Sequence, residues 1–540
     1  MGMISAMKST ILSCAIILTL ALGALNTVYA DSATWSTNPI SNDWNTADNW
    51  TPNTVPDGPD DIATFGLSQH TNVFVSSSVE VNEVIFNTGA SPFNINIAND
   101  QELTISGIGI INNSGVAQNF VCSIFAGVVL TNNATVGEMT FFTVRGGHGN
   151  KNNGGFVSFS DTASAGNGTF VLEPPETPDA NSGGIVAFGD NSSAGNGTFT
   201  AEFASLLSFQ GNSSAADGTF IVEGGRIEFG LGSTEVATAG NGVFIINSGS
   251  VVFSNDSGAG DATLIANPGT ISFELGAQDG GEARIELFGN GTLDISENIF
   301  GLVSVSVGSI EGDGIVLLGS NKLITGSNDL STFFSGTIQD SGSLTKIGRG
   351  TITLTGENTY TGGTTVEDGK LVIANSSGSG TGSGPVSVTS GKLGGTGIIA
   401  GATTIGTGSG TGAFLAPGAE TKTGQVPLTI QSALTFNADA TYTCTFKTQQ
   451  NRHGTRAKVG MVIANGVTIN SGAMIELIGN ITGALSQGFV MTLISNTSVD
   501  PITGTFSNLP DGGIVTINGN NFQASYTGGD GNDLTLTVVP

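Results

Sequence analysis

The side chains that come nearest to a hydrolytic pair are Asp161 and Asp190. Each follows a phenylalanine of a repeating phrase by two residues (Phe159 and Phe188), so we expect the two carboxylates to be neighbours in the fold. Hydrolysis of a glycosidic bond needs two carboxylates close together, but nothing near this pair in the sequence supplies a base, a set of metal ligands or a substrate cleft. We therefore predict no catalytic residue and no enzyme, with a polysaccharide-active enzyme as the alternative.

Candidate metal ligands are scattered along the chain. Asp57, Asp60 and Asp61 could form a calcium loop, but Pro56-Asp57-Gly58 is first a turn signal. Residues 528–533 echo one copy of a calcium-binding nonapeptide, and a single copy cannot form a stacked calcium site, so we predict a turn. No metal and no cofactor is predicted, because the histidines lie in separate regions and the sequence cannot assemble them into a zinc site: His70, His148 and His453.

Composition excludes several kinds of partner. The chain has 540 residues, a net charge of −28 and only 11% charged residues. Nucleic-acid binding needs a basic patch, and an acidic surface avoids anionic lipids, so neither partner is expected. After the N-terminal segment, no apolar run is long enough for a membrane span. One basic cluster, Arg452–Lys458, is predicted to be a solvated turn, with contact to an anionic envelope polymer as the alternative.

Residues 1–30 have the pattern of a secretory signal peptide. Lys8 gives a positive start, an apolar stretch follows, and Val28-Tyr29-Ala30 is a small-residue cleavage site. Either Met1 or Met7 could be the true start. The prediction is an exported protein that begins at Asp31 and is found outside the cell or at the bacterial surface. A disulfide between the two remaining cysteines is not expected, because they are far apart in the chain: Cys122 and Cys444.

One phrase recurs between about Gly154 and Leu287 with a period of mostly 20 to 24 residues, which is the signature of stacked repeats. Each unit offers two short alternating strands separated by Gly, Asn and Ser turns. Stacked copies can bury a continuous core that one copy cannot, so the pattern predicts an all-β fold, a β-solenoid. The phrase ends at Phe170, Phe199, Phe220, Phe244, Leu264 and Ile285, and a second apolar position falls at Phe159, Phe188, Phe209, Phe229, Phe253 and Phe273.

Two features of the array are candidates for surface roles. The turn position after the first glycine or alanine of the phrase carries amides and carboxylates, and equivalent positions one strand spacing apart can form a side-chain ladder. One turn of the array is longer because of Glu173–Asn181, whose prolines cannot join a strand ladder. This loop is either a neutral insertion or part of a binding face. The ladder positions are Asn167, Asn196, Asp217, Asn241, Asp261 and Glu282.

Loops and aromatic residues outside the array have two readings each. The segment Thr143–Gly155, with Arg145, His148 and Lys151, matches no phosphate loop and is predicted to be an ordinary loop. All three tryptophans lie near the N-terminus of the mature chain, where a solenoid needs a cap. The alternative is an aromatic platform for sugar rings. The tryptophans are Trp35, Trp44 and Trp50.

The stretch from Leu344 to Leu371 contains Asn358-Thr359-Tyr360-Thr361-Gly362-Gly363-Thr364-Thr365. It closely resembles the passenger-associated transport repeat, the autotransporter-associated β-strand repeat of secreted bacterial proteins. The ending Tyr526–Leu534 also resembles the last rung of such passengers. The resemblance implies a right-handed parallel β-helix that acts in adhesion, autoaggregation or envelope structure.

The same resemblance implies partners and an anchor. Family passengers precede a C-terminal transmembrane β-barrel, and since the chain stops at Val539-Pro540 we expect it to lack the barrel and to need a separate anchor or secretion partner. Surface glycans or proteins of a host or of bacteria are the expected partners.

The predicted fold class is thus an all-β, right-handed parallel β-helix (β-solenoid) with an N-terminal cap and irregular loops. Its expected parts are a signal peptide (1–30), a Trp-rich cap (31–72), β-helix rungs (73–153), the repeat array (154–300), further rungs (301–343), the transport repeat (344–375), and C-terminal rungs with a terminal cap (376–540).

Overall fold

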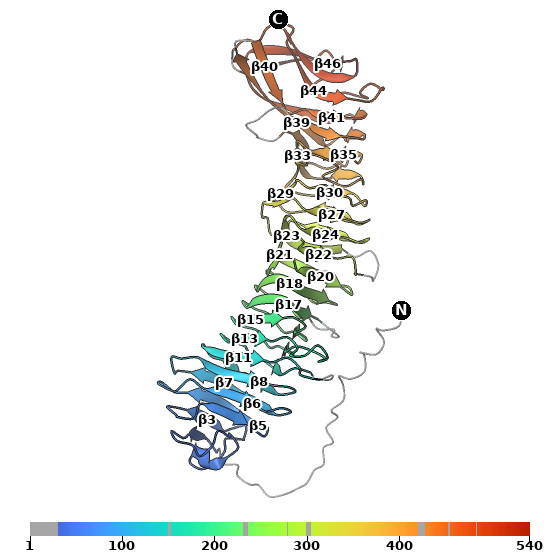
Figure 1. The fold of residues 1–540 in the computed structure, drawn as a ribbon. Coiled ribbons are helices and arrows are strands. Elements are labelled where there is room, and N and C mark those ends of the chain that lie inside the picture. The colour runs from blue at the N-terminus through green and yellow to red at the C-terminus, as the bar shows by residue number, and fades with distance from the viewer. Residues whose placement is uncertain are drawn as a thin grey trace.

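The computed structural model describes residues 31–149, 153–230, 236–277, 279–298, 304–418, 427–451, 454–481 and 483–540, and the predicted signal peptide lies outside these ranges. The chain forms an elongated stack of short strands with a single 3-10 turn, η1 (Ala47–Asn49) (Figure 1). Most strands pair in parallel with the equivalent strand of the next turn, so the predicted all-β parallel β-helix is confirmed. Within the described residues, no helix is long and apolar enough to cross a membrane.

Three columns of parallel strands form the faces of the helix, and the chain visits them in the order A, B, C in each turn. Column A contains β1 (Ala33–Trp35), β3 (Ile62–Phe65), β5 (Val79–Phe86), β7 (Glu102–Asn112), β10 (Thr135–Val136), β21 (Asp279–Leu287), β23 (Ser304–Gly312), β25 (Lys322–Thr325), β28 (Ser343–Lys346), β30 (Thr364–Val366), β32 (Val386–Val388), β35 (Thr403–Ile405), β38 (Leu434–Phe436) and β42 (Val467–Ile469). Between β10 and β21 the column is reduced to single-residue bridges at Ser164, Ser193, Ser214, Thr238 and Gly258.

Column B follows column A in each turn. It contains β4 (Asn72–Val75), β6 (Asn94–Ile97), β8 (Gln118–Cys122), β11 (Thr140–Val144), β13 (Thr169–Leu172), β15 (Thr198–Glu202), β17 (Thr219–Phe229), β18 (Val243–Ser254), β19 (Thr263–Ala266), the second halves of β21 and β23, β26 (Thr332–Phe334), β29 (Thr351–Leu354), β31 (Lys370–Ile373), β33 (Gly391–Gly395), β36 (Ala413–Pro417), β39 (Ala440–Asn451) and β43 (Met474–Asn480).

Column C begins with the first halves of β5 and β7 and takes in the second halves of β17 and β18. Its other strands are β9 (Gly127–Leu130), β12 (Phe156–Phe159), β14 (Ile185–Phe188), β16 (Leu206–Phe209), β20 (Thr270–Glu274), β22 (Thr292–Asp294), β24 (Ile315–Leu317) and β27 (Thr337–Gln339). A second sheet continues it with β34 (Ile398–Ile399), β37 (Leu428–Ile430), β41 (Val462–Ala464) and β44 (Val490–Asn496).

The expectation of two strands per turn was therefore incomplete. In the array, the third contact of each turn is a single Ser, Thr or Gly, which leaves no alternating run for the sequence to reveal. These residues also shape the corner that follows. The Ser164 hydroxyl accepts a hydrogen bond from the Gly166 N–H (3.1 Å), and Ser193 and Gly195 repeat the contact at 3.0 Å. The hydroxyl turn sets up the positive φ of the glycine, +54° at Gly166.

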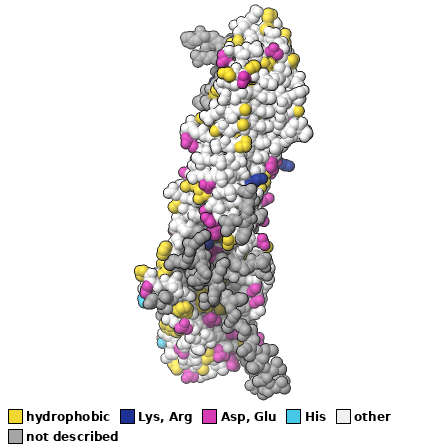
Figure 2. Space-filling model, turned by 90° about the vertical axis from the view of Figure 1, so that its right-hand side faces the viewer, with side chains coloured by type: hydrophobic (Ala, Val, Ile, Leu, Met, Phe, Trp, Pro, Cys, Tyr) yellow, Lys and Arg dark blue, Asp and Glu magenta, His cyan; other side chains and the backbone are white. Residues whose placement is uncertain are grey.

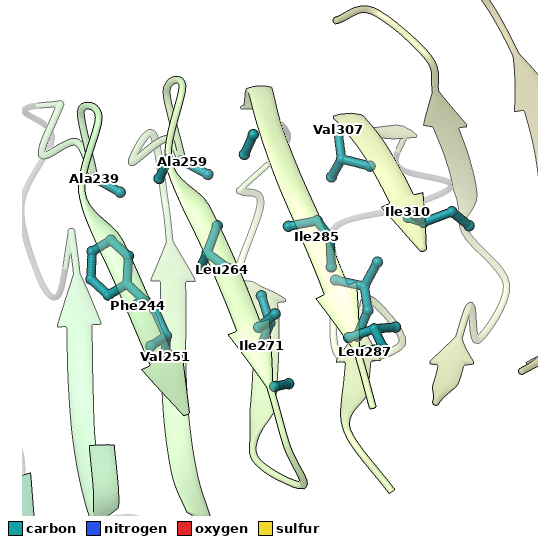
Figure 3. Close-up of a cluster of buried hydrophobic side chains, with 14 of the residues drawn as sticks. Ala239, Phe244, Val251, Ala259, Leu264, Ile271, Ile285, Leu287, Val307 and Ile310 are labelled. Atoms are coloured by element: carbon teal, nitrogen blue, oxygen red, sulfur yellow. The ribbon is translucent and has the colours of Figure 1, made fainter. Parts of the chain in front are cut away.

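The core consists of inward-facing side chains stacked in register along each column. In column C, Phe209 and Phe229 pair in register and their ring centroids lie 4.6 Å apart at an interplanar angle of 4°. Column B carries a second Phe rank that meets the first edge-on, as Phe159 meets Phe170 at 73°. Beyond Phe244 this rank becomes aliphatic, with Leu264, Ile285 and Ile310 (Figure 3). The proposed repeat register is confirmed.

The N-terminal end is closed by the three tryptophans, which are almost fully buried. Trp50 lies 5.1 Å from Trp35 and 5.0 Å from Trp44, ring centroid to centroid, and each indole N–H donates to a backbone carbonyl. Phe65 of the first turn packs against all three rings. Because no ring face is exposed, the tryptophans cap the stack, and the alternative of a sugar platform built from them is wrong.

The C-terminal end closes differently from the expectation. β44 pairs antiparallel with β47 (Asp533–Val539), which pairs antiparallel with β46 (Asn520–Gly528), and β45 (Ile514–Ile517) pairs antiparallel with β46. Residues 526–534 therefore form a hairpin and not a last parallel rung. Antiparallel strands can be joined by a short turn, and this lets the chain fold back over the end of the stack. The turn predicted at 528–533 is confirmed, since β46 ends and β47 begins there.

Candidate binding surface at the paired side loops

Asp161 and Asp190 are neighbours, as predicted, but both serve the turns between columns C and A. The Asp190 carboxylate accepts the N–H of Asp161 (3.0 Å), and the Asp161 carboxylate accepts the N–H of Asn132 (3.0 Å). All three residues have positive φ. Each carboxylate thus caps the turn of the preceding coil, a contact that orients the pair along the stack and not toward a common substrate.

The predicted calcium alternatives do not assemble among the described residues. The Asp61 carboxylate accepts the N–H groups of Asp57 (3.1 Å) and Gly58 (2.9 Å), which confirms the turn. His70 contacts Asn42 (2.7 Å), His148 lies far along the chain, and His453 falls outside the described ranges. No group of three or more His, Cys, Asp or Glu side chains that could hold a metal ion occurs in the described parts of the chain.

The amide and carboxylate ladder is present as an exposed corner between columns A and B. The Asn196 amide donates to Asn167 (3.3 Å), and the Asn241 amide donates to Asp217 (2.9 Å). The residue that follows the ladder position has no positive φ, whereas the residue before the ladder position does. The sequence did not identify that position. The ladder accordingly binds neighbouring turns to one another.

Two loops leave the stack at the corner between columns B and C in consecutive turns. The first joins β11 to β12, and the second, which contains Glu173–Asn181, joins β13 to β14. We call residues 145–149, 153–155 and 173–184 the paired loops. They hold one another through backbone and side-chain contacts: Gly147 N to Ser182 O (2.9 Å), Glu176 N to Gly147 O (2.9 Å), Gly149 N to Thr177 Oγ1 (2.8 Å) and Gly154 N to Ser182 Oγ (3.2 Å).

A side-chain contact crosses between the paired loops. The His148 Nδ1 atom lies 3.1 Å from Glu176 Oε2, and both side chains are about half exposed. Beside them is a hollow of about 240 Å³ lined by Asn99, Ser123, Ile124, Arg145, His148 and Glu176. Burial raises the pKa of Glu173 at the base of the second loop, and the positive charge of Arg145 partly opposes this. The hollow therefore places cationic, anionic and amide groups together on an otherwise sparsely charged surface.

The sequence indicated each of these loops separately and missed their association. The signal was available, because both loops follow the column B strand of successive turns, and equivalent corners of a parallel stack lie one strand spacing apart. Lys151 of the first loop lies outside the described residues.

The basic cluster Arg452–Lys458 is not the solvated turn that was expected. Residues 454–459 form β40 (Gly454–Val459), which pairs antiparallel with β39, as in Lys458 with Lys447. Arg452 and His453 lie outside the described ranges. The turn prediction was wrong for these residues because Gly454-Thr455 is typical of a turn, whereas the long strand β39 offers an edge with which they pair.

The transport-repeat stretch covers more than one turn of the helix, with β28 and β30 in column A and β29 and β31 in column B of successive turns. Its Asn358 side chain joins three turns, because it accepts the Ile338 N–H (2.8 Å) and donates to Gly380 O (2.7 Å). The buried Tyr360 hydroxyl contacts Thr364 Oγ1 at 2.6 Å. Asn358, Tyr360 and Thr364 are therefore buried and hold the coil together, whereas Thr359, Thr361 and Gly362 of the same motif are exposed.

An elongated parallel β-helix with capped ends and one such internal repeat is the architecture of a passenger-like protein. The family model for the passenger-associated transport repeat matches residues 344–373. A region of 94 residues is 42% identical to the adhesin BmaC autotransporter of Brucella suis biovar 1 (strain 1330) and covers 17% of this chain. The match spans only 3% of the length of that relative. The chain is thus an autotransporter passenger-like protein.

Proposed function

We propose that the protein is a non-enzymatic, adhesin-type β-helix of the cell surface or exterior, and that the paired loops carry its recognition. The family to which the repeat belongs and the name of the Brucella relative support a surface adhesin. The observation that carries the assignment to the loops is their mutual bonding. Two consecutive loops that hold each other by main-chain contacts form a projecting element with a defined shape, whereas neutral insertions need no contacts.

Polar chemistry at the loops fits recognition of a mixed polar surface on a glycan or a protein. Arg145 gives a planar cation, Glu176 an anion, and Ser123 and Asn99 give neutral hydrogen-bonding groups around one hollow. A shallow hollow of this size suits an epitope and not a deeply enclosed substrate.

The test is an excision matched to the neighbouring turn. Between Leu172 and Ile185, deletion of residues 174–181 leaves the four residues Glu-Ser-Gly-Gly. The next turn spans the same corner with Glu-Phe-Ala-Ser, residues 202–205. The deleted chain should keep its β-rich circular dichroism and lose most adherence when it is displayed on cells, because loop length affects stability only weakly.

A second variant tests whether the side chains of the second loop are needed or only its length. Replacing residues 174–181 by an eight-residue Gly/Ser segment, with glycine at 176 and 177, keeps the loop length and removes the side-chain contacts of Glu176 with His148 and of Thr177 with Gly149. Adherence should fall as far as in the deletion. Unchanged adherence of both variants, with the wild type adherent, would refute the role of the loops, and a wild type that adheres to nothing would contradict the adhesin function itself.

A further inference from the structure

The first four strands of column B have an outward face whose own side chains carry no charge, and the Asp43 carboxylate borders it beside Phe74. These four strands, β4, β6, β8 and β11, pair in register, so their outward residues form two straight ranks. None of these side chains is ionisable, although the whole chain has a net charge of −28. Sparse charge is also visible on the face drawn in Figure 2, but acids are scattered over that face. We call these residues the Phe–Asn face: Asn72, Asn94, Asn119 and Phe141 in one rank, and Phe74, Asn96, Val121 and Thr143 in the other.

Two aromatic rings stand on this face in contact with solvent. Phe74 is 46% exposed and Phe141 is 38% exposed. They lie three turns apart, which corresponds to about 14 Å along the axis. The backbone of Phe74 is fixed by the neighbouring segment, because its N–H donates to Asn42 O (2.8 Å) and its carbonyl accepts the Trp44 N–H (2.8 Å). The rings are thus held by a rigid sheet and not by mobile loops.

Amide groups fill the space between the rings. The Asn94 side chain donates to Asn72 (3.0 Å), and the Asn119 side chain donates to Asn94 (3.0 Å). The Asn96 amide donates to Val73 O and Asn94 O (3.2 and 3.1 Å), while its side-chain oxygen accepts no bond from the described residues. The amide row therefore offers free donors at Asn72 and free acceptors at Asn96 and Asn119.

We propose that the Phe–Asn face binds a neutral polysaccharide chain that lies along the axis of the stack. Sugar rings have apolar faces that pack on Phe74 and Phe141, as aromatic groups favour, and their hydroxyls exchange hydrogen bonds with the asparagine row. The amide row repeats once per turn, a spacing close to one sugar residue in an extended chain. A face whose two ranks hold no ionisable group, and whose end is bordered by the Asp43 carboxylate, gives no attraction to an anionic polymer, which favours an uncharged one.

This surface is separate from the paired loops. It lies on the flat of column B, whereas the loops project from the corner between columns B and C. The interaction does not depend on the proposed adhesin role, and excision of residues 174–181 should leave it intact.

The test is affinity electrophoresis of the full mature chain in gels that contain β-glucan, xylan or galactomannan, with polygalacturonate as the charged comparison. The expected result is retardation by at least one neutral polymer, with little dependence on salt. The Phe74→Ala/Phe141→Ala variant should bind at least tenfold more weakly. The matched control is Phe333→Ala, because Phe333 is 69% exposed on column B at a distant turn. Circular dichroism checks that each variant is folded.

Three outcomes would overturn the proposal: no retardation by any of the neutral polymers, retardation by polygalacturonate alone, or equal weakening in the Phe333 control. Because Phe74 and Phe141 are exposed, loss of folding is not expected to obscure the result. Should a variant nevertheless unfold, Asn96→Ala tests the same face through its free amide oxygen, and binding equal to wild type in that variant would also contradict the proposal.

Discussion

A single side chain repeated in register accounts for much of the core. The Phe ranks stack ring on ring within a column and edge-on between columns, the two arrangements that aromatic quadrupoles favour. Phe229 is fully buried in the column C rank and touches Phe209 below and Phe253 above. A substitution at such a residue therefore disturbs the packing of two neighbouring turns.

Phe229→Asp should be severely destabilising, because it places an unpaired charge in the core and removes the ring contacts with Phe209, Phe244 and Phe253. We expect a loss of several kcal/mol in the free energy of unfolding. The urea midpoint of the variant measures it, and Phe203→Asp is the control, since Phe203 is 69% exposed at the corner of the same array. A midpoint for Phe229→Asp close to that of the control would contradict the register.

Lys346 of the transport repeat is a buried cation without a carboxylate contact. Its Nζ atom donates to the carbonyls of Gly348 (2.8 Å) and Asp368 (3.4 Å) and contacts Ile347 O. Burial lowers the pKa of Lys346 from its ordinary value of 10.5, and the nearby Asp368 and Asp329 oppose this. Folding thus disfavours the charged form of this lysine.

Lys346 should consequently contribute a stability that rises with pH near the alkaline limit. Between the lowered pKa of folded Lys346 and 10.5, the unfolded chain holds more protons on this residue than the folded chain, so its contribution to the free energy of unfolding increases with pH. Burial raises the pKa values of Cys122, Cys444 and Tyr360, and these groups contribute the opposite slope in the same range. Lys346→Met should therefore lose stability with rising pH more steeply than the wild type, whereas Lys322→Met, at an exposed lysine, should follow the wild type. Urea midpoints measured from pH 7 to 10.5 test the difference, and parallel profiles for all three proteins would disprove it.

At the scale of strands and turns, the sequence predicted the strands that show an apolar alternation. It did not predict contacts that depend on how segments distant in the chain are placed in space. The two apolar ranks that contain Phe170 and Phe229 could be predicted, because apolar residues alternate along each strand and recur in each turn. The single bridges of column A at Ser164 and its equivalents carry no alternation. The hairpin β46–β47 differs from a parallel rung only in chain direction, which composition does not encode. Contacts between loops depend on which corners coincide in space, so the paired loops emerged only from the structure.

At the corner between columns A and B, equivalent positions of two turns should respond in opposite ways to an exchange of glycine and alanine. Gly195 has a φ of +57°, and a Cβ there would lie 2.9 Å from Gly166 O. Ala216 occupies the same place in the next turn with a φ of +49°. Gly195→Ala should therefore destabilise the protein by about 1–2 kcal/mol, whereas Ala216→Gly should be neutral or stabilising. Thermal unfolding of the two variants decides, and destabilisation by both would argue against a common turn geometry.

The whole molecule is a rod whose length follows from its columns. Column A passes through twenty successive turns, with Gly258 and Asp279 joined by the Ala259 N–H to Asp279 O bond. The turns are marked by Ala33, Ala63, Val84, Ile110, Val136, Ser164, Ser193, Ser214, Thr238, Gly258, Asp279, Ser306, Ile324, Thr345, Thr365, Ser387, Thr404, Thr435, Thr468 and Thr503. Nineteen spacings give a stack about 90 Å long.

Small-angle X-ray scattering of the chain from Asp31 should report this shape. A rod of about 90–100 Å gives a radius of gyration of about 30 Å, whereas a compact domain with the same number of residues gives about 24 Å. A value near the lower figure would contradict the extended stack. Added salt should change the radius little, because the core that sets it is apolar.

The parallel strands run across the long axis of the rod, and this arrangement determines how the molecule bears tension. A pull applied at the two ends loads the hydrogen bonds between turns one after another, since each turn contacts only its neighbours. Freeing one turn of 20 to 24 residues releases about 70–80 Å of chain. Under flow or shear, the protein would therefore lengthen in small steps, turn by turn, while the remaining coils stay intact. A filament that yields in this way limits the peak force on whatever it is attached to.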